Sequence, residues 1–233
     1  MPSKTFKIKN FEISSFNDFL KALIKDKTIL QFKNHNGNDA YLLASFFGHL
    51  EIMKYLENEH KWDIHIKNNF GNDAYLFASL YGHLEIMKYL ENEHNWDIHI
   101  RNTFGNDVYL MACINGHLDI MKYLENEHNW DIKVKDVYGS DAYILASLKG
   151  HLEIMKYLEK EHNWNIHVKD KKGKNAYHYG NSEIRKHLDE FYKKEKEEKV
   201  SKLEEELKLE KEKNSKLEDE LKQIKEMLKK FIS

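Results

Sequence analysis

The sequence is almost devoid of proline and cysteine. Pro2 is the only proline and Cys113 the only cysteine among 233 residues, which excludes a disulfide within the chain. No segment approaches the roughly 18 consecutive apolar residues that would predict a transmembrane helix. The first residues contain no apolar run of signal-peptide length. We therefore expect a reducing, intracellular environment and a cytoplasmic location.

The sequence also lacks an excess of charge of either sign. Its 37 lysines and arginines are matched by 39 aspartates and glutamates, for a net charge of -2. Nucleic-acid-binding domains normally carry a clear basic excess, so we expect no nucleic-acid partner. Nothing in the sequence predicts a membrane partner either. A glycine-rich phosphate-binding loop is missing as well.

A 34-residue unit occupies the middle of the chain, with copies that begin at Gly37, Gly71, Gly105 and Gly139. A fixed period of this size indicates a stacked repeat array. The boundaries divide the chain into an N-terminal capping half-repeat (residues 1–36), four full repeats (37–70, 71–104, 105–138 and 139–172), a truncated C-terminal capping repeat (173–192) and a coiled coil (193–233).

Each repeat reads as two short helices joined by a glycine turn. In the second repeat, Asp73 is suited to cap the first helix and Gly82 to end it. The second helix is predicted over residues 84–93, with apolar residues on one face. Helices this short are unstable alone in water, so the repeats must be stabilised by stacking. The expected fold class is an all-α solenoid followed by a long helix.

The turn between the two helices carries a family motif. Gly82-His83-Leu84-Glu85 resembles the opening of the second helix in ankyrin repeats, and residues 48–51, 116–119 and 150–153 repeat it, with an aspartate in the third copy. The first-helix motif T-P-L-H-x-A is altered, because residues 39–44 read DAYLLA. The motif's histidine, which ties neighbouring loops in the family, is lost. This lysine- and asparagine-rich variant also resembles the ankyrin repeat proteins of giant, mimivirus-like viruses of amoebae.

The resemblance implies a partner-binding surface. In ankyrin repeat proteins a partner protein usually binds the concave face, which the turn tips and the first helices form. The corresponding positions in this sequence are Phe47, Phe70, Tyr81, Phe104, Asn115, Tyr138 and Lys149. This surface would change from aromatic to basic along the chain. The aromatic residues at the tips either bind the partner or only pack between neighbouring turns, and the sequence favours neither.

The last segment has heptad spacing. Its core positions are occupied by Val200, Leu203, Leu207, Asn214, Leu217, Leu221, Ile224 and Leu228. Opposite charges flank this stripe, and an asparagine at a core position is a device that fixes a parallel dimer. We predict a parallel homodimer, in which the two helices run in the same direction. An antiparallel dimer and a single solvated helix are the alternatives.

Other recurring residues favour structural roles. Each full repeat has one tryptophan in its final loop (Trp62, Trp96, Trp130 and Trp164), which we interpret as an anchor against the second helix rather than as an exposed ladder. The histidines recur along the array instead of converging, so no metal site is expected. Cys113 is expected to be a buried, inert thiol. We predict no catalytic residue, cofactor or metal.

These observations favour a non-enzymatic protein–protein interaction scaffold. The array would bind a partner protein through its concave face, and the coil would join two copies of the chain. The alternatives are a substrate-recruiting adaptor for host ubiquitination and a structural component of a virion. If the protein is viral, the host cytoplasm is the expected location.

Overall fold

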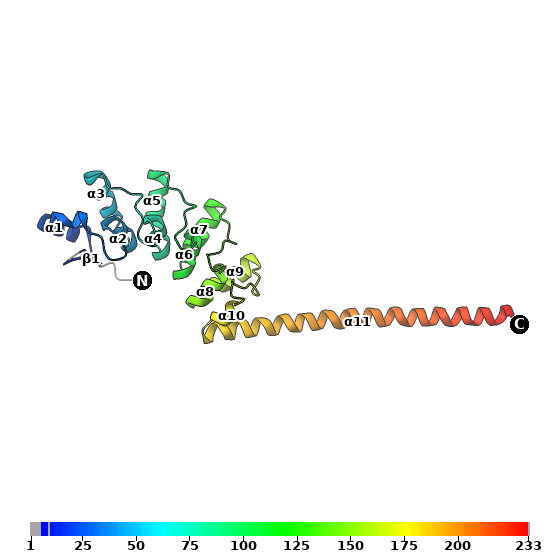
Figure 1. The fold of residues 1–233 in the computed structure, drawn as a ribbon. Helices are drawn as coiled ribbons and strands as arrows, with labels where there is room; N and C mark the ends of the chain where they lie inside the picture. The colour runs from blue at the N-terminus through cyan, green and yellow to red at the C-terminus, as the bar shows by residue number, and fades with distance from the viewer. Residues whose placement is uncertain (1–5, 9, 233) are drawn as a thin grey trace. The chain divides into compact units, whose positions relative to one another are not determined.

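The computed structural model describes residues 6–8 and 10–232, and helices are the main secondary structure of these residues. Helices follow one another in pairs, one pair for each repeat (Figure 1). The predicted all-α class is confirmed. The pairs are α2 (Ala40–Phe47) with α3 (Leu50–His60), α4 (Ala74–Tyr81) with α5 (Leu84–His94), α6 (Val108–Asn115) with α7 (Leu118–His128), and α8 (Ala142–Lys149) with α9 (Leu152–His162).

The chain divides into two compact units, one that ends at Ile184 and one that begins at Arg185. The first unit contains the repeats and the short helix α10 (Ala176–Tyr179). Helix α11 begins at Ser182 and ends at Ile232. Among the described residues, no helix combines the length and the hydropathy that crossing a membrane requires.

The first helix of each full repeat begins at an aspartate, as predicted. The Asp73 side chain accepts a hydrogen bond from the Leu76 backbone N–H at 2.9 Å, and the helix ends at Gly82, which has a φ of 81°. A side chain at Gly82 would be strained by this φ. It would also place a Cβ 2.6 Å from the imidazole of His117 in the next repeat. The glycine is therefore required both by the turn and by the stacking.

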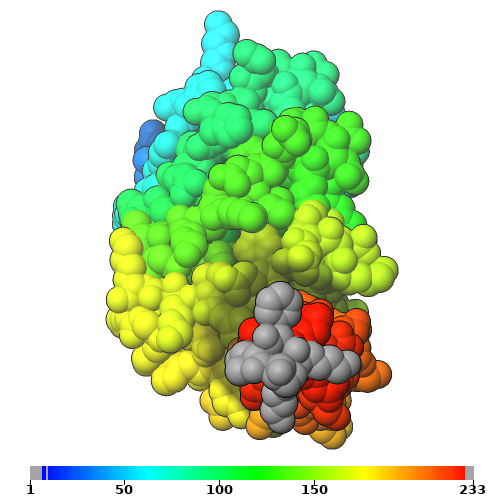
Figure 2. Space-filling model, turned by 90° about the vertical axis from the view of Figure 1, so that its right-hand side faces the viewer, coloured from blue at the N-terminus to red at the C-terminus, as the bar shows by residue number. Residues whose placement is uncertain are grey.

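First helices of successive repeats pack directly on one another, so that the repeats stack in chain order (Figure 2). The Ser79 hydroxyl donates to the Val108 carbonyl of the next first helix at 2.6 Å. In the third repeat Cys113 replaces this serine, and its thiol approaches the Ala142 carbonyl at 3.0 Å. Cys113 is fully buried, and burial raises the pKa of its thiol. These features are those of an inert thiol.

The turn tips of neighbouring repeats are joined by asparagines and by the backbone. The Asn102 side-chain amide donates to Asn72 Oδ1 at 2.9 Å. The backbone N–H of Thr103 donates to the Phe70 carbonyl at 2.9 Å, and that of Val137 to the Phe104 carbonyl at 3.0 Å. The asparagine contacts therefore join the loops that the family's histidine would otherwise tie.

The N-terminal cap contains strands that the sequence analysis missed. Strands β1 (Phe6–Ile8) and β2 (Phe11–Ile13) pair antiparallel, and Ile8 and Ile13 are buried. Helix α1 (Phe16–Lys25) follows, with Ser15 as its cap, and η1 (Lys27–Gln31) leads to the first repeat.

The tryptophans are buried or half-buried, as structural anchors should be. The Trp62 backbone N–H donates to the Leu56 carbonyl of α3. Its indole N–H donates to Asp39 Oδ2 at 3.0 Å. The loop therefore contacts the second helix through the Trp62 backbone, and the indole adds a bond to the cap of the first helix that we did not expect.

The residue after each second helix provides a stability prediction. This residue has a positive φ in all four full repeats: Lys61, Asn95, Asn129 and Asn163. Asparagine tolerates this conformation better than lysine. Lys61→Asn should therefore stabilise the protein by about 0.5–1 kcal/mol and raise Tm by about 2 °C. Asn95→Lys should lower Tm by a similar amount in the same thermal denaturation assay. The prediction is contradicted if neither variant changes Tm, or if the two Tm shifts have the opposite signs.

Candidate partner-binding groove

A partly buried carboxylate joins the second helices of successive repeats. Glu57 accepts hydrogen bonds from the Tyr41 hydroxyl of its own repeat at 2.7 Å and from the Tyr89 hydroxyl of the next repeat at 2.6 Å. His94 Nε2, also in the next repeat, lies 2.9 Å from the same carboxylate. The contacts of Tyr89 and His94 with Glu57 tie two repeats in one register.

The same carboxylate link recurs twice more along the array. Glu91 accepts from the hydroxyls of Tyr75 and Tyr123, and Glu125 from those of Tyr109 and Tyr157. His162 Nε2 lies 3.0 Å from Glu125. His128 Nε2 lies 3.2 Å from Glu91, without the alignment of a hydrogen bond. This set of contacts explains why the sequence of the second helix is so constant.

The tyrosines of this network remain hydrogen-bond donors. Burial, reinforced by the acceptor Glu57, raises the pKa of Tyr41 far above its usual value. The same causes raise the pKa of Tyr75 beside Glu91 and of Tyr109 beside Glu125. The hydroxyls therefore stay protonated near neutral pH and keep donating to the carboxylates.

The turn histidines position the ends of the first helices. His83 Nε2 lies 3.0 Å from the Phe46 carbonyl, and His151 Nε2 lies 2.9 Å from the Ile114 carbonyl. Each imidazole therefore reaches back to the first helix of the preceding repeat. These helix ends carry several of the predicted partner-binding residues, so the repeated motif holds the residues that vary.

A cavity of about 470 Å³ lies between the last turn tips and the first helix α8. We call it the tip pocket. Its walls combine apolar side chains from the tips, from α8 and from α10. The lining residues are Phe104, Asn106, Asp136, Tyr138, Ser140, Ile144, Leu145, Leu148, Asp170, Lys172 and Tyr179.

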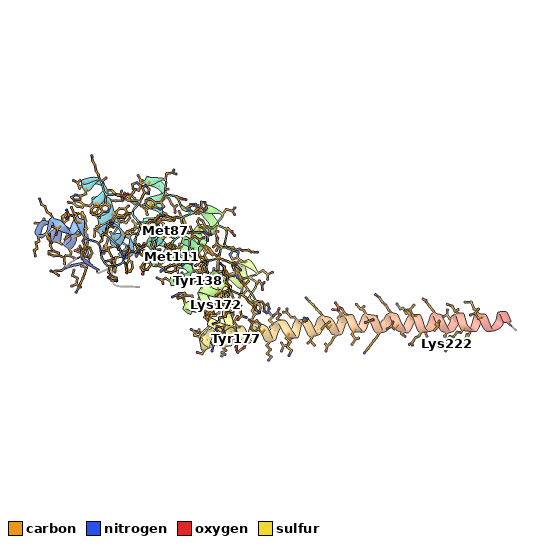
Figure 3. The ribbon with its side chains drawn as sticks, in the orientation of Figure 1. Met87, Met111, Tyr138, Lys172, Tyr177 and Lys222 are labelled. Carbon is orange, nitrogen blue, oxygen red and sulfur yellow. The ribbon has the colours of Figure 1, made fainter. Side chains whose placement is uncertain are left out.

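Both carboxylates of the tip pocket have partners within the protein. Asp136 Oδ1 accepts from the backbone N–H groups of Tyr138 and Ser140 at 2.9 and 2.8 Å. Asp170 accepts from the Tyr179 hydroxyl at 2.5 Å and from two backbone N–H groups. The Lys172 ammonium, in contrast, has no hydrogen bond or ion pair within the described part of the chain. Figure 3 labels Tyr138 and Lys172 on neighbouring tips.

The predicted site residues fall into two groups. Tyr138 and Phe104 line the tip pocket and are 54% and 40% exposed. Phe70 is 40% exposed and stacks on Phe104, with ring centroids 6.1 Å apart. The aromatic tip residues thus pack on one another and remain accessible at the same time.

The remaining predicted residues lie at the ends of the first helices. Tyr81 is half-buried, and its ring centroid lies 3.9 Å from that of Phe46. Phe47 is half-buried beside this pair. Asn115 and Lys149 are exposed. The tip pocket also includes residues that the sequence analysis did not select, among them Ile144, Leu145 and Tyr179, because their convergence depends on how repeats stack.

The histidines in the final loops have structural contacts. His65 stacks on Trp96 of the next repeat, with centroids 4.8 Å apart and planes inclined by 24°. His99 stacks on Trp130 at 4.9 Å and 16°. Among the described residues, no group of three or more His, Cys, Asp or Glu side chains is placed to hold a metal ion.

The comparison with protein families agrees with this geometry. The family model of ankyrin repeats (three copies) matches residues 12–102, 92–172 and 110–188. The chain belongs to the ankyrin repeat family. No curated protein matched it. Ankyrin repeats generally mediate protein–protein interactions and are typically non-enzymatic, which agrees with the coarse function expected from the sequence.

Proposed function

We propose that the protein is an interaction scaffold that binds a partner protein along its turn tips and first helices. The observation that carries this proposal is the tip pocket, where exposed aromatic and aliphatic side chains surround a cavity of about 470 Å³. Exposed, clustered aromatic residues are the class that dominates binding energy at protein interfaces. They are also found where the repeats differ in sequence.

The charges around the tip pocket indicate what the partner offers. The two aspartates are engaged by backbone N–H groups, while Lys172 lines the pocket and Lys149, which follows the lining residue Leu148, is exposed. We therefore infer that the partner inserts an apolar side chain between the tips and places acidic residues beside these lysines. Phe70 and Phe104 extend the contact toward the N-terminal repeats.

A triple substitution tests whether the aromatic residues of the turn tips bind the partner. Phe70→Ala, Phe104→Ala and Tyr138→Ala together should reduce capture of the partner from native cells at least tenfold, because the aromatic anchors are lost. Affinity capture with quantitative mass spectrometry measures this loss. The matched control changes three equivalent exposed residues on the second helices, Asn58→Ala, Asn92→Ala and Asn126→Ala.

The control variant should retain the partner that the aromatic variant loses. Circular dichroism should show that both variants keep the helical content of the natural protein. Full retention of the partner by the folded aromatic variant would place the binding site elsewhere.

We further propose that helix α11 joins two copies of the chain in a parallel homodimer. The predicted heptad core is solvent-exposed in the single chain: Val200 is 46% exposed, Leu207 50% and Leu217 61%. A heptad stripe of mainly apolar residues on one helix is stabilised when a second helix covers it. Asn214 at a core position and opposite flanking charges favour a parallel pair in register.

Light scattering tests this role of α11. The full chain should have twice its monomer mass of 27.9 kDa, and Leu207→Glu with Leu221→Glu should restore the monomer mass. Asn214→Cys tests the orientation, because the two cysteines of a parallel pair face each other and should form an interchain disulfide on mild oxidation. The natural Cys113 is buried and should not compete. A monomeric natural protein would refute the dimer, and a dimer that forms no such disulfide would refute the parallel orientation.

Narrower roles would use the same surfaces. A substrate-recruiting adaptor would co-purify with ubiquitin-ligase subunits, and a structural component of a virion of a giant amoebal virus would be abundant in particles. The scaffold function stands ahead of both, because the tip pocket supports binding of a partner without indicating either assembly. A cytoplasmic location is part of the same proposal.

A further inference from the structure

The third repeat departs from the others at one stacked pair. At the first two repeat interfaces an imidazole covers the indole of the next repeat, His65 on Trp96 and His99 on Trp130. At the third interface Lys133 replaces the histidine. Among the described residues, no ring stacks on Trp164. The face of this indole has therefore lost the partner that its counterparts have.

A second residue of this interface differs from its counterpart at the second interface, although the first interface has the same residue type at Lys67. Arg101 Nη1 donates to the carbonyls of Gly105 and Lys135 at 3.0 and 3.1 Å, and its Nη2 lies 3.4 Å from Asp107 Oδ2. Lys135 is the equivalent residue at the next interface, and no side-chain hydrogen bond of its ammonium exists within the described structure. A cavity of about 300 Å³ lies here, which we call the Trp164 pocket; its walls include Lys133, Lys135, Asp141, His162, Trp164 and Val168.

The polar groups of the Trp164 pocket differ in availability. Asp141 accepts from the Ile144 backbone N–H at 3.0 Å as a helix cap, and His162 is engaged by Glu125. The Trp164 indole N–H is buried and completes no hydrogen bond within the described residues. Burial raises the pKa of the Asp141 carboxyl in the same pocket. The groups that remain for a ligand are two lysine ammonium groups and an aromatic face.

We propose that the Trp164 pocket binds a small planar aromatic anion. The aromatic ring takes the place of the missing imidazole on Trp164, and the anionic group pairs with Lys133 and Lys135. Stacking on an indole and pairing with two ammonium groups are complementary to such a ligand. The Trp164 pocket shares no lining residue with the tip pocket, so this site is independent of partner binding.

Indole-3-acetate is a suitable probe because a bicyclic ring with one carboxylate fits a cavity of this size. The full-length protein has four tryptophans, whose indole N–H resonances can be followed by nitrogen-15 NMR and assigned with Trp→Phe variants. The Trp164 resonance should shift saturably, with a Kd of about 1 mM or tighter. Cyclohexylacetate, which lacks the aromatic ring, and 3-methylindole, which lacks the charge, should each bind at least tenfold more weakly.

Variants that exchange the two kinds of interface complete the test. Lys133→His restores the residue found in the other interfaces and should weaken binding at least tenfold, while the protein stays folded. His99→Lys together with Arg101→Lys should create a second site on Trp130. The number of probe molecules bound per chain should then rise from one to two. The proposal is overturned if the Trp164 resonance does not shift, if all four resonances shift equally, or if Lys133→His binds as well as the natural protein.

Discussion

The array depends on the partly buried glutamates that link its second helices. Glu57, Glu91 and Glu125 each face two tyrosine hydroxyls and one histidine, contributed by two successive repeats. Hydrogen bonds to a charged group contribute about 1.5–3 kcal/mol each, and a buried carboxylate that loses its donors is strongly destabilising. A repeat that slipped along its neighbour would remove the tyrosine and the histidine of the next repeat from that carboxylate and leave only the tyrosine of its own repeat. The glutamates therefore set both the stability and the register of the stack.

This register fixes what the variable residues can do. Turn tips joined through their backbones, and first helices held by the turn histidines, present side chains at constant spacing along one surface. A residue that differs between repeats therefore changes the surface locally, while the backbone of the stacked repeats stays the same. Tyr138 and Lys172 line the tip pocket, and Lys133 lines the Trp164 pocket. Constant residues hold the frame, while the substituted ones carry the proposed binding functions.

Local features were predictable from the sequence, and contacts between repeats were not. Asp73 as a cap and Gly82 as a terminator follow from backbone chemistry within one turn. The three-residue strands at Phe6–Ile8 and Phe11–Ile13 are too short to show a period, so they were missed. The glutamate partners Tyr89 and His94 were visible as constant residues, yet their pairing with a residue of another repeat depends on the stacking geometry.

The most direct test of this account is a double-mutant cycle between Glu91 and Tyr123, measured by urea denaturation. Glu91→Gln and Tyr123→Phe should show a coupling free energy of about 1 kcal/mol or more, because the hydroxyl and the carboxylate meet across a repeat interface. The same cycle with the exposed Glu85→Gln should show none. A coupling below about 0.3 kcal/mol for Glu91 and Tyr123 would contradict the claim that these carboxylates hold the array together.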